Sequence, residues 1–277
     1  MVLLALHQAI QDGNISKIKK LIQEKVDINE KNTNGNTPLH SAILRKNFEI
    51  VKTLIESGAD VNAKGTKNKS PLYIALEYRF ADTLKFVKLL VSSGAKYDDQ
   101  YIFLALKFPD LLEYLVVEIG ANVNANYNHD LFHFLSLEDH YGTPLHVAVR
   151  QGNLSTIEFL LKNKADINSR NGISMTPLHL SLCSFSSDYK FKDRDKVIQK
   201  RIATFLIDQG ADLRLNTLGR NGETTLEIAE RFGYGMPEMI MAKMKKIDTP
   251  TKISKGNVNA FDPKSQEALS KQALSQF

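Results

Sequence analysis

The stretch Thr37-Pro38-Leu39-His40 decides the fold, because it is the clearest copy of a short motif that returns along the chain. It recurs 33 residues later as Ser70-Pro71-Leu72-Tyr73. It returns as Thr143-Pro144-Leu145-His146 and, after another 33 residues, as Thr176-Pro177-Leu178-His179, and Thr224-Thr225-Leu226-Glu227 is a worn copy. A period of this length indicates small structural units stacked side by side.

A second motif lies out of phase with the first and is best seen in Gly58-Ala59-Asp60-Val61-Asn62. Between the two motifs, apolar residues follow helical spacing, first at Leu39, Ala42 and Ile43 and then over residues 50–55. Proline at the first position of a helix loses no hydrogen bond, and glycine suits a helix end. Each unit is therefore predicted to be a helix, a turn, a second helix and an extended loop.

The two motifs, recurring in fixed order over about 240 residues, resemble the ankyrin repeat. The match is best over residues 35–63 and 142–168. The resemblance implies an all-α ankyrin-repeat solenoid of about seven helix-turn-helix units with protruding finger loops.

We expect the repeat domain to span residues 1–247, with insertions at 126–140 and 184–199. Residues 248–277 have no repeat character and carry proline and glycine in a polar stretch, so we expect a flexible C-terminal tail. In the short fourth unit, Asp110 is expected to N-cap the helix that follows it.

Members of this family bind proteins through a concave groove, lined by the first helices and the finger loops, and share no catalytic centre. Aligned on the first motif, the exposed groove and finger positions are predicted to bind a protein partner; arginine and tyrosine are favoured there. These positions are Asn34, Asn36, Arg45, Lys69, Glu77, Tyr78, Tyr141, Arg150, Gln151, Arg231 and Phe232. Because Arg45, Arg150 and Arg231 are among them, we expect an acidic or polar segment as the ligand.

Composition narrows the function classes further. One cysteine, Cys183, excludes an internal disulfide framework and a cysteine-based zinc site. No apolar run reaches the ~18–20 residues that a membrane span needs. The net charge of +5 includes five spaced lysines at 243–255 without interleaved aromatic residues, which we interpret as a solvated end and not a nucleic-acid site.

Two chemical alternatives are weighed beside the binding module. His129 and His133 would share a helix face and His140 lies close by, so the first insertion could hold zinc or an enzymatic centre. Cys183 with His179 could form a nucleophile pair, but no orienting acid is evident.

We therefore predict a non-enzymatic module without a cofactor or small-molecule substrate, acting as a cytoplasmic monomer. Lys- and Asn-rich ankyrin proteins with irregular insertions also resemble effectors that bacteria deliver into host cells, where the tail would act as a secretion signal. An adaptor that recruits host machinery such as a ubiquitin ligase is a further alternative, although no F-box segment is evident.

Overall fold

The computed structural model describes residues 5–127, 142–183, 193–217, 222–232 and 236–248, and all its regular elements there are helical. The chain forms two compact units, residues 1–237 and 238–277. The predicted all-α fold is confirmed. The expected domain boundary at residue 247 stays a prediction, and the expected tail lies outside the described residues apart from Asp248.

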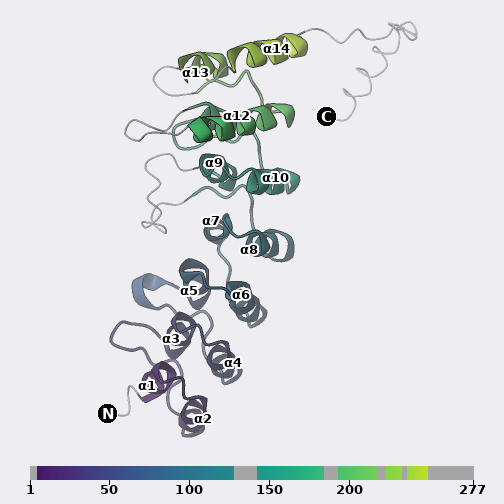
Figure 1. Ribbon diagram of the computed structural model, residues 1–277. Helices are drawn as coiled ribbons and strands as arrows, with labels where there is room; N and C mark the ends of the chain where they lie inside the picture. Colours follow the sequence, from purple (N-terminus) through teal and green to yellow (C-terminus); the bar gives the residue numbers. More distant parts are fainter. Residues whose placement is uncertain (1–4, 128–141, 184–192, 218–221, 233–235, 249–277) are drawn as a thin grey trace, which may run out of the picture. The chain divides into compact units, whose positions relative to one another are not determined.

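Six pairs of antiparallel helices form most of the first unit (Figure 1). They are α1 (Ala5–Gln11) with α2 (Ile15–Gln23), α3 (Pro38–Leu44) with α4 (Phe48–Glu56), α5 (Pro71–Tyr78) with α6 (Thr83–Ser92), α7 (Ile102–Ala105) with α8 (Pro109–Glu113), α9 (Pro144–Arg150) with α10 (Leu154–Lys162), and α11 (Pro177–Leu182) with α12 (Asp193–Asp208). The remaining elements are α13 (Thr225–Phe232), α14 (Pro237–Asp248), short 3-10 turns at Thr66–Asn68 and Asp99–Tyr101, and a π-turn at Tyr114–Glu118.

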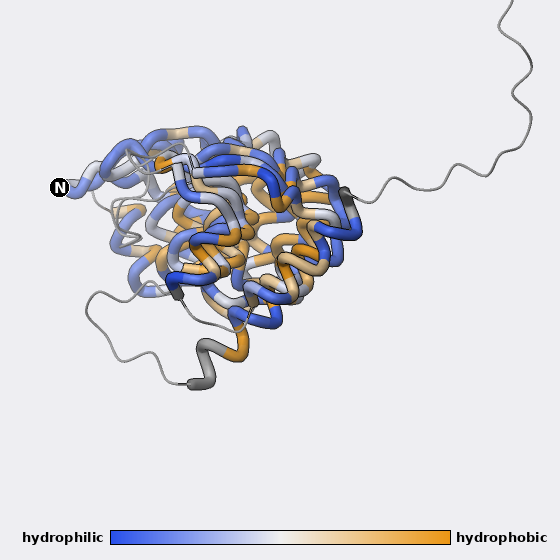
Figure 2. Tube along the Cα trace, turned by 90° about the horizontal axis from the view of Figure 1, so that it is seen from above, coloured by the Kyte–Doolittle hydropathy of each residue, from blue (hydrophilic) through white to orange (hydrophobic). Residues whose placement is uncertain are grey.

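The first helix of each pair packs on the first helix of the next, so that α1, α3, α5, α7, α9, α11 and α13 form one continuous row. Their apolar positions are fully buried: Leu39, Ala42 and Ile43 in α3 are the type example. The second helices bury a matching stripe, such as Ile50 and Leu54 in α4. Figure 2 shows hydrophobic segments on the inside of this stack, where burial of each leucine contributes about 1.5–3 kcal/mol.

Two local predictions need correction. Asp110 does not N-cap its helix, because Pro109 takes the first helical position and Phe108 the N-cap position, with Asp110 inside the first turn. Helix α12 begins at Asp193, so the last part of the expected insertion 184–199 is the start of a 16-residue helix.

No helix among the described residues is long and apolar enough to cross a membrane.

Candidate partner-binding surface

The first motif works as a helix cap. Thr37 is the N-cap of α3, and its hydroxyl lies 2.7 Å from His40 Nδ1 while the backbone N–H of Thr37 points at the same nitrogen. His40 Nε2 lies 3.0 Å from the carbonyl of Lys69 in the next repeat. A carbonyl only accepts, so Nε2 carries the proton and Nδ1 accepts, which makes the ring neutral.

Equivalent histidines link other repeats in the same way. His146 Nε2 lies 3.0 Å from the carbonyl of Met175, and His179 Nε2 lies 3.1 Å from the hydroxyl of Thr225. At the start of the stack His7 uses its nitrogens differently: Nδ1 lies 3.1 Å from Ser41 Oγ in α3 of the next repeat, and Nε2 lies 2.9 Å from the carbonyl of Glu30. The sequence interpretation missed His7, although it stands 33 residues before His40.

Burial keeps the motif histidines neutral. Desolvation lowers the pKa of His40, and it lowers the pKa of His146 and of His179 to about 4. These side chains therefore hold neighbouring repeats together as neutral hydrogen-bonding groups at neutral pH.

Other residues replace histidine where the motif is worn. Tyr73 packs edge-on against Tyr101 of the next repeat, with ring centroids 5.7 Å apart, and Phe103 packs on Tyr127 at 5.0 Å. In the last copy, the Glu227 carboxylate accepts from the backbone N–H of Thr224 at 2.7 Å, which lowers the pKa of Glu227. Tyr73 thus replaces the histidine contact with the next repeat by ring packing. Glu227 replaces the histidine at the helix cap by a carboxylate.

A backbone hydrogen bond closes the base of each of these finger loops. The donor and acceptor pairs are Asn32 and Asn36, Gly65 and Lys69, Asn171 and Met175, and Thr217 and Glu223. The N–H of Tyr127 donates to the carbonyl of Gly142 at 3.1 Å in the corresponding place. The chain between them, which carries most of the predicted insertion 126–140, is therefore inserted into the finger of the fifth repeat.

A ladder of asparagine side chains joins the second motifs. The Oδ1 atom of Asn62 accepts from the N–H of Lys96 at 2.8 Å, and its Nδ2 donates to the carbonyl of Gly94. Asn29, Asn124 and Asn168 accept in the same way from Asp60, Asp166 and Asp212. These asparagines fix the spacing of the loops and so position the fingers.

Asn34 and Asn36, the predicted binding residues of the finger at 32–36, form hydrogen bonds with the next finger. Asn36 Oδ1 accepts from the N–H of Thr66 at 3.0 Å, and the Thr66 hydroxyl contacts both Asn36 and the carbonyl of Asn34. The side chain of Asn34 is exposed, whereas Asn36 is half-buried. Asn36 is thus a contact between fingers as much as a candidate contact with a partner.

Two positively charged residues among the predicted binding residues, Lys69 and Arg231, form ion pairs within the chain. Lys69 Nζ forms an ion pair with both carboxylate oxygens of Glu77, at 2.5 and 2.6 Å, and lies 4.8 Å from the centre of the Tyr73 ring. Arg231 forms an ion pair with Glu223. The positive charge of Arg231 is therefore compensated within the chain.

The remaining candidates lie at the C-terminal ends of first helices. Arg45 and Gln151 are exposed, Tyr78 is 56% exposed, and Arg150 is half-buried. Since α3, α5, α7 and α9 pack in one row, these ends fall on one side of the stack, which we call the predicted partner surface. Tyr141 lies outside the described residues, and only the backbone of Phe232 is described, in α13.

The chemical alternatives find limited support. Burial raises the pKa of Cys183 to about 11, so its thiol is protonated at neutral pH and a poor nucleophile. In the part of the chain that the structure describes, no three His, Cys, Asp or Glu side chains are grouped as metal ligands. His129, His133 and His140 lie outside it, and the metal site there stays a prediction.

Comparison with known families agrees with this geometry. A family model described as "Ankyrin repeats (3 copies)" matches residues 6–101, and one described as "Ankyrin repeat" matches residues 141–172. These two parts of the chain are ankyrin repeats. Two ankyrin repeat proteins of Rickettsia bellii are similar to it: one is 25% identical over 142 residues and the other 34% identical over 95.

These alignments cover 46% and 32% of this ankyrin-repeat chain, and 54% and 48% of the two relatives, so the chain spans about half the length of the curated relatives it matches. Among solved structures, the ankyrin repeat domain of Bcl-3 superposes with a TM-score of 0.64 at 20% identity, covering 87% of this chain and 97% of that one. The human ASB11 ankyrin repeat domain gives 0.59 at 24% identity, covering 86% and 96%. At these identities the likeness shows the fold.

Proposed function

We propose that this ankyrin-repeat chain is a non-enzymatic protein-binding module that holds a partner protein on the predicted partner surface and the adjoining fingers. The observation that carries the proposal is the placement of exposed Arg45, Tyr78 and Gln151 at matching ends of stacked helices. The buried faces of the same helices are used to build the stack. Arginine and tyrosine are the residue types that supply most binding energy in protein interfaces.

The charge of this surface favours an acidic or polar segment as the ligand. Arg45 and Arg150 both contribute positive charge to the surface, and Arg45 is exposed. Lys69 is neutralised by Glu77 and Arg231 by Glu223. We expect the partner's acidic groups near Arg45. The proposal includes no cofactor, nucleic acid or membrane span, and it treats the module as a cytoplasmic monomer.

Charge reversal tests this proposal. The variant Arg45→Glu with Arg150→Glu should lose the proteins that the wild-type chain captures from native-host extracts, as identified by mass spectrometry. The matched control is Lys52→Glu with Lys162→Glu, which changes the net charge equally on exposed positions of α4 and α10. Equal loss in both variants, or unchanged capture by the first, would contradict the proposal.

A second proposal concerns the place of action. Similarity to two Rickettsia bellii proteins supports a bacterial effector or adaptor, delivered by type IV secretion into the cytosol of a host cell. The test is translocation of a reporter enzyme fused to the chain with and without residues 249–277. Translocation that is absent, or that is the same after deletion, would count against a secretion signal in the tail.

A further inference from the structure

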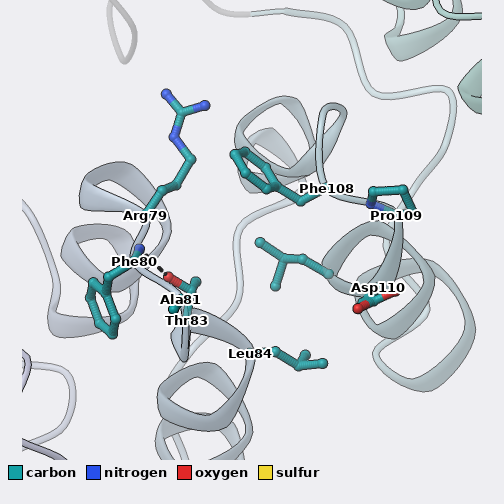
Figure 3. A pocket seen from close by; sticks show the side chains of 9 residues that line it. Arg79, Phe80, Ala81, Thr83, Leu84, Phe108, Pro109 and Asp110 are labelled. Atoms are coloured by element: carbon teal, nitrogen blue, oxygen red, sulfur yellow. Dashed lines mark hydrogen bonds between the residues drawn. The ribbon is translucent and has the colours of Figure 1, made fainter.

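A pocket lies between the third and fourth repeats, next to the C-terminal end of α5, and none of the residues predicted to bind a partner lines it. Its volume is about 440 Å³, and it opens between the α5–α6 connection and the start of α8 (Figure 3). The connection between α5 and α6 spans residues 79–82, one residue more than the connections at 45–47 and 151–153. We call this hollow the loop pocket.

Apolar side chains make up most of the loop pocket. Phe80 and Leu84 line it on the third repeat, and Phe108, Pro109 and Leu111 line it on the fourth. Phe108 remains 37% exposed. Concave apolar sites with a few polar groups at the edge are the usual form of a binding pocket, because filling them removes apolar surface from water.

One cation lies against the aromatic wall of the loop pocket. The guanidinium of Arg79 stacks on Phe108 with its Cζ 5.3 Å from the ring centre. The Nε–H of Arg79 donates to the carbonyl of Glu77 at 3.3 Å, which leaves the two Nη groups without a partner among the described residues. A planar guanidinium fixed in this way is suited to accept a carboxylate with two hydrogen bonds.

The acidic residue at the loop pocket is Asp110. Asp110 lies on the side of the fourth repeat, in the first turn of α8, where backbone N–H groups favour a negative charge. It therefore does not require a cationic ligand, and the uncompensated group at the rim is Arg79.

We propose that the loop pocket is a second docking site, which takes a segment of a partner protein with a large apolar side chain next to an aspartate or glutamate. The apolar side chain fills the hollow lined by Leu84, Phe108 and Leu111, and the carboxylate binds the Nη groups of Arg79. The lining residues differ from the residues predicted to bind a partner, although Arg79 follows Tyr78 in the chain, so variants at the loop pocket test this site separately from the proposed function.

The test uses the full chain and a synthetic peptide, acetyl-Gly-Ser-Phe-Asp-Gly-Ser-amide, titrated into isotope-labelled protein and followed by NMR. Amide shifts are expected to cluster at residues 79–84 and 108–111. Binding should weaken at least about tenfold when the peptide's Phe becomes Ser or its Asp becomes Asn, and by a similar factor in Arg79→Glu.

Arg201→Glu is the matched control, because Arg201 is an exposed arginine of α12 that belongs neither to the loop pocket nor to the predicted partner surface. Arg201→Glu should bind the peptide as the wild type does. Equal weakening in both variants, or shifts spread along the stack, would overturn the loop pocket as a specific site. Binding that requires deletion of residues 249–277 would overturn the partner as its occupant, because that tail contains Phe261-Asp262, an apolar residue next to an acid.

Discussion

Neutral histidines are the residues on which the link between repeats depends. Each donates from Nε2 to the following repeat and accepts at Nδ1 from its own cap, an arrangement that one added proton on Nδ1 destroys. The folded state resists that proton, whereas the unfolded chain takes it up near pH 6.5. Stability supplied by these groups is thus fully present above pH 6.5 and is lost as the pH falls toward 4.

We predict that the free energy of unfolding drops between pH 7.5 and 4.5, with about 2–3 kcal/mol of the drop due to His146. His146→Gln should be less stable at pH 7.5 but should lose less stability over the same interval. Urea unfolding at the two pH values measures both effects. An unchanged drop in the variant would contradict the assignment.

The backbone conformation of Lys164 leads to a second prediction. Lys164 adopts φ +68° at a loop position where Gly58 and Gly210 stand in other repeats. Left-handed backbone is costly for a residue with a Cβ, so Lys164→Gly should raise the free energy of unfolding by about 0.5–1 kcal/mol. Lys52→Gly, at an exposed position in the middle of α4, should lower it by about 1 kcal/mol. Destabilisation by both substitutions would refute the argument.

Helix length distinguishes the fourth repeat from its neighbours. Helix α7 has four residues, against seven in α3 and α9, and α8 passes into a π-turn. The stability of a repeat stack depends on contacts between neighbours. We therefore expect this repeat to have the lowest local stability, because it has fewer backbone hydrogen bonds and a shorter packed face.

We predict that amide hydrogen exchange is faster in α7 and α8 than in α3, α4, α9 and α10. Hydrogen exchange followed by mass spectrometry of proteolytic peptides gives the comparison directly. Uniform protection across the repeats would show that the aromatic contacts of Phe103 and Tyr101 fully compensate for the missing turns.

The regular elements could be predicted from sequence because their causes are local. Proline at the first helical position and the spacing of Leu39, Ala42 and Ile43 are enough to place a helix. The start of α12 at Asp193 could not be predicted, since the polar insertion carries no periodic apolar pattern. The compensation of Lys69 by Glu77 and the loop pocket depend on distances between side chains, which residue types alone do not give.

In the whole molecule, the regular repeats form the stack, and the irregular segments are where this chain differs from a regular repeat protein. The row of first helices continues through the fourth repeat, so the exposed ends of α3, α5 and α9 keep a common direction. Tyr127 and Gly142, which pair through a backbone hydrogen bond, meet at the base of the finger of the fifth repeat. We propose that the first unit is one continuous binding surface, with its specificity at Arg45, Tyr78 and Arg150.

Site-specific photocrosslinking tests this account most directly. A benzoylphenylalanine at position 78 or 151, on the predicted partner surface, is compared with one at position 52 or 162, on exposed faces of second helices. In extracts of the native host, the account predicts the same discrete partner protein crosslinked from 78 and 151 and none from 52 and 162. Crosslinks to that protein from the second helices, with none from 78 and 151, would contradict it.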